Sequence, residues 1–157
     1  MKNTILFIEG SDGFIPKAII KKLNEARFEL ICIPDNVDEI KNNRDRAEMI
    51  LYYLSENNEC VTKTVTYLID LCKTEHKSLC LAGEPFNMAK AKKISGSEII
   101  YATYQRPINI DGLVMKMESL ASSYTEFKRE KNILIIDDDS DYIKVLLHWL
   151  KSAYHVD

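Results

Sequence analysis

Three consecutive carboxylates, Asp137, Asp138 and Asp139, are the residues whose type and placement most clearly suggest chemistry. They directly follow residues 133–136 (Ile-Leu-Ile-Ile), a short apolar run that is typical of a buried strand. Carboxylate oxygens gathered at one strand end form a site that suits Mg²⁺ or a similar small divalent cation. An alternative stays open, because acidic residues before a helix also cap its first turn and complement its dipole.

Other reactive residue types are scattered rather than grouped. The loop at residues 9–13 (Glu-Gly-Ser-Asp-Gly) has two glycines but lacks the spacing and the lysine of a phosphate-binding loop. No two cysteines form a Cys-x-x-Cys pair, so we expect reduced, mostly buried thiols, and the histidines stand apart from one another. These residues are Cys32, Cys60, Cys72, Cys80, His76, His148 and His155. The sequence predicts no metal triad, no nucleophile–base pair and no enzyme activity.

Short apolar runs alternate with helical periods along the chain. Continuous apolar runs are typical of strands covered on both faces, and apolar residues at steps of three and four predict amphipathic helices. Strands are expected at residues 5–8, 28–33, 49–54, 78–82 and 98–104, and helices at residues 15–26, 37–43, 61–72, 86–94 and 110–124. This alternation predicts an α/β fold with a doubly wound five-stranded parallel sheet, whose function lies at the carboxyl ends of the strands.

An internal repeat divides the chain. Residues 5–14 can be laid against residues 133–142, since each segment is an apolar run that passes through polar residues into an amphipathic helix. Both helices end in a leucine, an alanine and an aromatic residue, with a slip of one residue inside the helix. We therefore predict a first domain at 1–122, a linker or helical extension at 123–131, and the first strand and helix of a second copy at 132–157.

Two motifs resemble the receiver domain of two-component response regulators. Residues 133–139 resemble the opening of that domain, and Tyr104-Gln105-Arg106-Pro107 is similar to the Lys-Pro motif, often with a cis-proline, after its fifth strand. The resemblance covers residues 4–122 and, as a fragment, 132–157. It implies the flavodoxin-like receiver topology with strand order 2-1-3-4-5. In that family an acidic pair holds Mg²⁺ beside a phosphate-accepting aspartate on the third strand.

The first copy departs from the family pattern at each position that phosphorylation needs. The acceptor position falls on Tyr53, the acidic pair is reduced to Glu9 with Asp12 as a remnant, the hydroxyl residue of the fourth strand is Ala82, and Arg106 replaces the lysine before Pro107. Without a nucleophilic carboxylate no acyl phosphate forms, and fewer acids bind Mg²⁺ less well. We predict a pseudo-receiver at 1–122, with no phosphoacceptor and no cofactor. One hypothesis is that Arg106 pairs with Glu9, and the alternative is that both are exposed charges that contribute little to stability.

The second copy keeps its acidic pair but stops at Asp157, so we expect the chain to be a fragment of a longer protein with two receivers in tandem. The resemblance implies that Asp137 and Asp138 hold Mg²⁺ only in a complete second receiver. That receiver would take phosphate from a histidine kinase or a phosphotransfer protein. Within this chain, the strand and the helix of the second copy are expected to pack on the first domain, to pair with another copy or to remain disordered.

The leading functional hypothesis is a cytoplasmic, non-enzymatic adaptor for docking or homodimerisation within a phosphorelay response regulator. The alternative is a small-molecule sensor of the same fold, which would bind a nucleotide or a flavin between Glu9 and Arg106. A net charge of −3 with scattered basic residues gives no nucleic-acid footprint. No apolar run approaches the roughly 20 residues that span a bilayer, so no membrane contact is expected.

Overall fold

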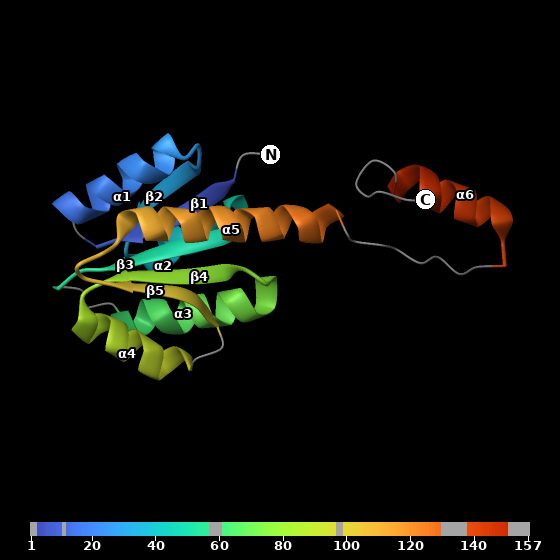
Figure 1. Ribbon diagram of the computed structural model, residues 1–157. Coiled ribbons are helices and arrows are strands. Elements are labelled where there is room, and N and C mark those ends of the chain that lie inside the picture. The colour runs from blue at the N-terminus through green and yellow to red at the C-terminus, as the bar shows by residue number, and fades with distance from the viewer. Residues whose placement is uncertain (1–2, 11, 57–60, 97–98, 130–137, 151–157) are drawn as a thin grey trace. The chain divides into compact units, whose positions relative to one another are not determined.

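The computed structural model describes residues 3–10, 12–56, 61–96, 99–129 and 138–150, with the backbone alone for residues 126–129. The chain divides into two units, Met1–Met117 and Glu118–Asp157. The first unit contains the whole sheet (Figure 1).

Five parallel strands form the sheet, in the order β2-β1-β3-β4-β5. Their bounds are β1 Thr4–Glu9, β2 Glu29–Pro34, β3 Met49–Leu54, β4 Ser78–Gly83 and β5 Ile100–Gln105. All six residues of β3 are buried, because helices cover both faces of this central strand. The fold class and strand order expected from the sequence are confirmed.

The helices connect the strands in the expected alternation. In the first unit they are α1 Phe14–Glu25, α2 Val37–Asn43, α3 Val61–Glu75 and α4 Pro85–Ser95, with a short 3₁₀ turn, η1 Arg44–Arg46, after α2. The polar sequence of α2 forms a helix with help from Asn36, whose side-chain oxygen accepts a hydrogen bond from the Asp38 amide at 2.8 Å. Pro85 opens α4, where a missing N–H leaves no helical bond unmade.

Buried apolar side chains form a layer on each face of the sheet. On one face, Leu6, Ile8, Ile50 and Tyr52 form a core cluster with residues of α2, α3 and α4. Strand residues alternate between faces, so Ile5, Phe7, Leu51 and Tyr53 point to the opposite face. That face is covered by α1 and by the start of α5, which supply the fully buried Ile19, Leu23, Leu113 and Met117 (Figure 1).

Two of the three cysteines that the structure describes are buried. Cys72 and Cys80 are buried, and burial raises the pKa of each thiol to about 12, so both remain protonated and unreactive near neutral pH. Cys32 is exposed on the edge strand β2, which differs from the predicted burial. Side chains of β2 are less buried than those of the central β3, because the helices above the sheet cover its edge less completely. Cys60 lies outside the described residues.

Helix α5 runs without interruption from Ile110 to Arg129, so residues 123–129 of the predicted linker are helical. Helix α6 covers Ser140–Leu150, and none of its residues is buried. The strand expected at 133–136 lies outside the described residues. Within the described part of the chain, no helix is long and apolar enough to cross a membrane.

Candidate functional site

The carboxyl ends of three neighbouring strands bring the predicted site residues together. Glu9 on β1 stands opposite Tyr53 on β3, and Tyr53 stands opposite Ala82 on β4. Glu9 is half-buried, whereas Tyr53 and Ala82 are fully buried. The phenol of Tyr53 thus occupies the centre of the strand tips, between a carboxylate and a methyl group.

Tyr53 is bound there by Arg106, which follows β5. The hydroxyl oxygen of Tyr53 accepts hydrogen bonds from Nε of Arg106 at 3.1 Å and from Nη2 at 2.6 Å. A cationic donor makes these bonds stronger than bonds between neutral groups. The hydrogen bond to Tyr53 also raises the pKa of Arg106, so the guanidinium carries its charge at every ordinary pH.

Two carboxylates complete the surroundings of Arg106. Its Nη1 forms an ion pair with Glu84, and the same nitrogen lies 3.6 Å from Oε1 of Glu56. The Glu84 side chain is 19% exposed and that of Glu56 is 72% exposed, so the Glu84 pair is the better shielded from water. The peptide bond between Arg106 and Pro107 is cis, and Pro107 itself is exposed.

The predicted pair between Arg106 and Glu9 does not form. Strand β1 is separated from β5 by β3 and β4, a distance of three strand spacings or about 14 Å. Glu84 follows β4, the direct neighbour of β5, and is therefore the carboxylate within reach of Arg106. The prediction was wrong because it placed both residues at the same edge of the sheet without counting the strands between them.

Backbone contacts fix the loops that carry these side chains. The Glu84 amide donates to the Leu54 carbonyl at 2.9 Å, and the Arg106 amide donates to the Gly83 carbonyl at 3.1 Å. The buried side chain of Asn87, on α4, donates to the Ser55 carbonyl at 2.6 Å. The ends of β3, β4 and β5 are thereby joined to one another by backbone as well as side-chain bonds.

Glu9 and Asp12 form a separate acidic corner. Asp12 is exposed and pairs with Lys17 at 2.8 Å. Partial burial, and to a lesser extent the charge of Asp12, raise the pKa of Glu9, while Lys17 lowers it. No group of three or more His, Cys, Asp or Glu residues that could hold a metal ion occurs among the described residues.

We expect the raised pKa of Glu9 to make the protein less stable as the pH rises. Between the ordinary glutamate pKa and the raised value, the folded protein binds more protons than the unfolded chain, so its free energy of unfolding falls with increasing pH. Replacing Glu9 with glutamine should remove this contribution to the pH dependence of the free energy of unfolding and slightly stabilise the protein at neutral pH. Urea denaturation from pH 4 to 7 measures the effect, and an unchanged slope in Glu9→Gln would contradict it.

Asp35, at the end of β2, was not recognised from the sequence as a site residue. It accepts hydrogen bonds from the Tyr52 hydroxyl at 2.7 Å and from the Thr64 hydroxyl at 2.6 Å. Tyr52 and Thr64 are both fully buried, so this one carboxylate satisfies two hydroxyls of the core. Its position directly after a strand was a usable signal, whereas the hydroxyl partners come from β3 and α3 and could not be read from spacing.

In the second unit, the acidic run at residues 137–139 contributes the N-terminal cap of the following helix. One side-chain oxygen of Asp139 accepts from the Asp141 amide at 2.9 Å and from the Tyr142 amide at 3.2 Å, which caps α6. The capping role left open for this run therefore applies to Asp139. Asp138 is exposed, and Asp137 lies outside the described residues. Magnesium binding by Asp137 and Asp138 stays a prediction.

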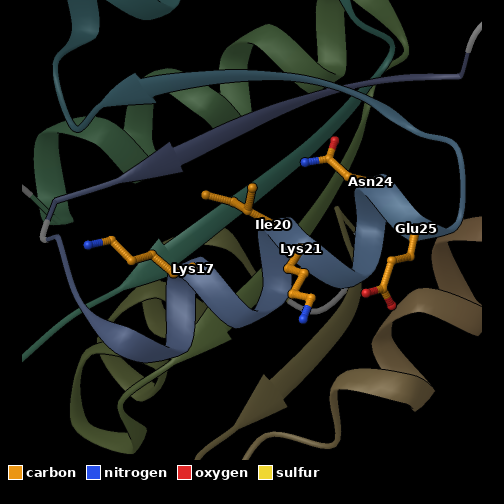
Figure 2. Close-up of a pocket in the computed structure, with 5 residues that line it drawn as sticks. All are labelled: Lys17, Ile20, Lys21, Asn24 and Glu25. Atoms are coloured by element: carbon orange, nitrogen blue, oxygen red, sulfur yellow. The ribbon is translucent and has the colours of Figure 1, made fainter.

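Two surface hollows are lined by residues that the structure describes. One runs along α1 and is lined by Lys17, Ile20, Lys21, Asn24 and Glu25 (Figure 2). The other is lined by Lys92, Gly96 and residues 100–103. Neither hollow includes Tyr53, Glu84 or Arg106, so neither corresponds to the ligand site that the sensor hypothesis places between Glu9 and Arg106.

No protein-family model matches the sequence, and no curated protein matches it either. The solved structures give clear likenesses. A CheY-like receiver domain protein from Methanospirillum hungatei is 13% identical with a TM-score of 0.59, covering 80% of this chain and 98% of that one.

Two further solved structures agree with this likeness. A receiver domain protein from Clostridium thermocellum is 12% identical with a TM-score of 0.59, covering 79% of this chain and 98% of its own. A receiver protein from Pseudomonas putida is 12% identical with a TM-score of 0.58, covering 76% and 98%. At such low identity the likeness concerns the fold. The chain has the fold of a response-regulator receiver domain.

Proposed function

We propose that residues 1–122 form a regulatory module of two-component signalling that has kept the receiver fold without the phosphorylation chemistry. The observation that carries this proposal is Tyr53. It stands where the family resemblance expects the phosphoacceptor carboxylate, it is fully buried, and its hydroxyl is engaged by Arg106. A buried phenol held by a guanidinium is a poor substitute for an exposed carboxylate nucleophile.

The neighbouring residues support the same proposal. Ala82, opposite Tyr53 on β4, offers no hydroxyl to a phosphoryl group. The guanidinium of Arg106 contacts Glu84 and Glu56, so a phosphoryl group would have to compete with two carboxylates for it. At the end of β1 the carboxylates are Glu9 and Asp12, and Asp12 is already paired with Lys17, which leaves a weak ligand set for Mg²⁺.

In this proposal the module acts by binding other proteins rather than by catalysis. It serves as a docking or homodimerisation adaptor in a phosphorelay response regulator. Phosphate from a histidine kinase or a phosphotransfer protein would reach a complete second receiver, with Asp137 and Asp138 as its Mg²⁺ ligands. The uninterrupted α5 and the exposed surface of α6 are the elements that support contacts with another protein.

Phosphorylation of the whole chain tests the proposal. The chain is incubated with acetyl phosphate and Mg²⁺, and its intact mass is measured, with an active receiver from another protein as the positive control. We expect no phosphoryl adduct on this chain under conditions that modify the control. An acid-labile adduct would contradict the proposal, and peptide mapping would then identify the acceptor, with Glu56 and Asp12 as the first candidates.

A further inference from the structure

We propose that Arg106 holds the ends of β3, β4 and β5 in one permanent arrangement, so that the module presents a constant surface to its partners instead of switching between two. This inference rests on the proposed function and adds to it the conformational behaviour of the module. We call the side chains of Arg106, Tyr53, Glu84 and Glu56 the Arg106 brace.

The brace joins residues at the ends of three different strands. Arg106 comes after β5, Tyr53 lies at the end of β3, and Glu84 comes directly after β4. One guanidinium uses Nε and Nη2 for the Tyr53 hydroxyl and Nη1 for Glu84. Because the guanidinium is planar and rigid, these contacts fix the three strand ends relative to one another.

Burial makes these contacts more durable than a surface ion pair. Tyr53 is fully buried, so packing holds its ring in place and its hydroxyl has no ready access to water. The side chain of Arg106 is 32% exposed and that of Glu84 is 19% exposed. Breaking the brace would leave a buried hydroxyl and a largely buried carboxylate without their partner, which disfavours any alternative arrangement.

A second set of bonds holds the same loops independently of Arg106. Asn87 binds the carbonyl of Ser55, and the Glu84 amide binds the carbonyl of Leu54. The loop after β3 is therefore attached to α4 and to β4 as well as to Arg106, through Glu56. A switch needs two states of similar free energy, and several simultaneous attachments favour one state over any other.

The permanent arrangement also needs no bound ion. Arg106 supplies the positive charge beside Glu84 and Glu56, so these carboxylates are compensated without Mg²⁺. Glu9 and Asp12, the remnant of the family's Mg²⁺-binding pair, lie outside the brace, and Asp12 is paired with Lys17. The module is therefore expected to respond neither to Mg²⁺ nor to a phosphoryl mimic. This separates it from a receiver whose strand-end loops rearrange when a phosphoryl group arrives.

Hydrogen exchange of backbone amides tests the brace. The informative amides are those of Glu84 and Arg106, whose hydrogen bonds to Leu54 and Gly83 close the loops. In the unmodified chain, we expect the same slow exchange at these amides with buffer alone, with Mg²⁺, and with Mg²⁺ and beryllofluoride. In Arg106→Gln, exchange at both amides should rise at least tenfold.

Two variants make the measurement specific. Tyr53→Phe removes one hydroxyl, is expected to keep the fold, and should raise exchange at the Arg106 amide by less than Arg106→Gln does. Lys90→Gln removes one positive charge from the exposed part of α4 and should leave exchange at both amides unchanged. If Arg106→Gln fails to fold, exchange at the Arg106 amide of Tyr53→Phe alone tests the brace.

The possible results separate the two proposals. Unchanged exchange in both Arg106→Gln and Tyr53→Phe would overturn the brace and leave the proposed function intact. Altered exchange of the unmodified chain with beryllofluoride would overturn both, since the module would then sense a phosphoryl group. Raised exchange in the brace variants, with no response to beryllofluoride, supports both.

Discussion

Replacing Gly83 with alanine is expected to lower the free energy of unfolding by more than about 4 kcal/mol, or to prevent folding altogether. A Cβ atom at this position would lie 2.1 Å from the Leu54 carbonyl oxygen and 2.8 Å from its carbonyl carbon. Both are backbone atoms of β3 and cannot turn aside as a side chain would. Gly83 also has φ +135°, a conformation that residues with a side chain rarely adopt.

Gly96→Ala is the matched control for this substitution. Gly96 also has a positive φ, of +68°, but a Cβ atom there meets nothing within 4 Å. Its replacement should cost only the backbone strain, about 1–3 kcal/mol. Chemical denaturation of the two variants compares a steric clash with strain alone. Equal losses in the two would show that β3 and β4 do not approach as closely as described.

Replacing Asp35 with alanine is expected to lower the free energy of unfolding by about 2–4 kcal/mol, the second largest effect. The carboxylate accepts from Tyr52 and Thr64, and its removal leaves two fully buried hydroxyls without this acceptor. The loss of each of these hydrogen bonds is expected to cost about 1–2 kcal/mol. Urea denaturation, with the exposed Asp45→Ala as control, measures the loss. The control should change stability by less than about 0.5 kcal/mol.

A double-mutant cycle identifies the origin of that loss. In a chain that already carries Tyr52→Phe and Thr64→Val, Asp35 has no hydroxyl to accept from, so Asp35→Ala should cost clearly less than it does alone. The difference is the coupling between the carboxylate and the two hydroxyls. If the cost is the same in both backgrounds, Asp35 stabilises the protein through another contact.

The secondary structure was largely predictable because each element has a local cause. Met49–Leu54 is a continuous apolar run and forms a strand with those bounds, and Val37–Asn43 forms the expected helix behind its Asn36 cap. The last strand is displaced from its expected start at residue 98 and begins at Ile100. An irregularity in its pairing with β4, at Leu79 and Cys80, has no signature in hydrophobicity.

The candidate site was only partly predictable. Counting along the third strand placed Tyr53 at the tip, since strand position is a local property. The bond between Tyr53 and Arg106 depends on tertiary neighbours that are 53 residues apart in sequence. Glu84 was overlooked because a single carboxylate directly after a strand gives no local sign of the residue that it pairs with. Strand order 2-1-3-4-5, which was available, already makes Glu84 a better partner for Arg106 than Glu9.

The two adjacent tyrosines of β3 also bear on how the chain avoids misfolding. A strand that is apolar on both faces, as Met49–Leu54 is, contains no hydrophobic alternation, so hydrophobicity alone scarcely distinguishes the native pairing from one slipped by a residue. Tyr52 carries its hydroxyl to Asp35 on one face, and Tyr53 carries its hydroxyl to Arg106 on the other. A slip by one residue would place one tyrosine in the position of the other, so that one of the two charged partners would lose its tyrosine hydroxyl. The polar ends of two otherwise hydrophobic side chains thus favour the native alignment of the central strand.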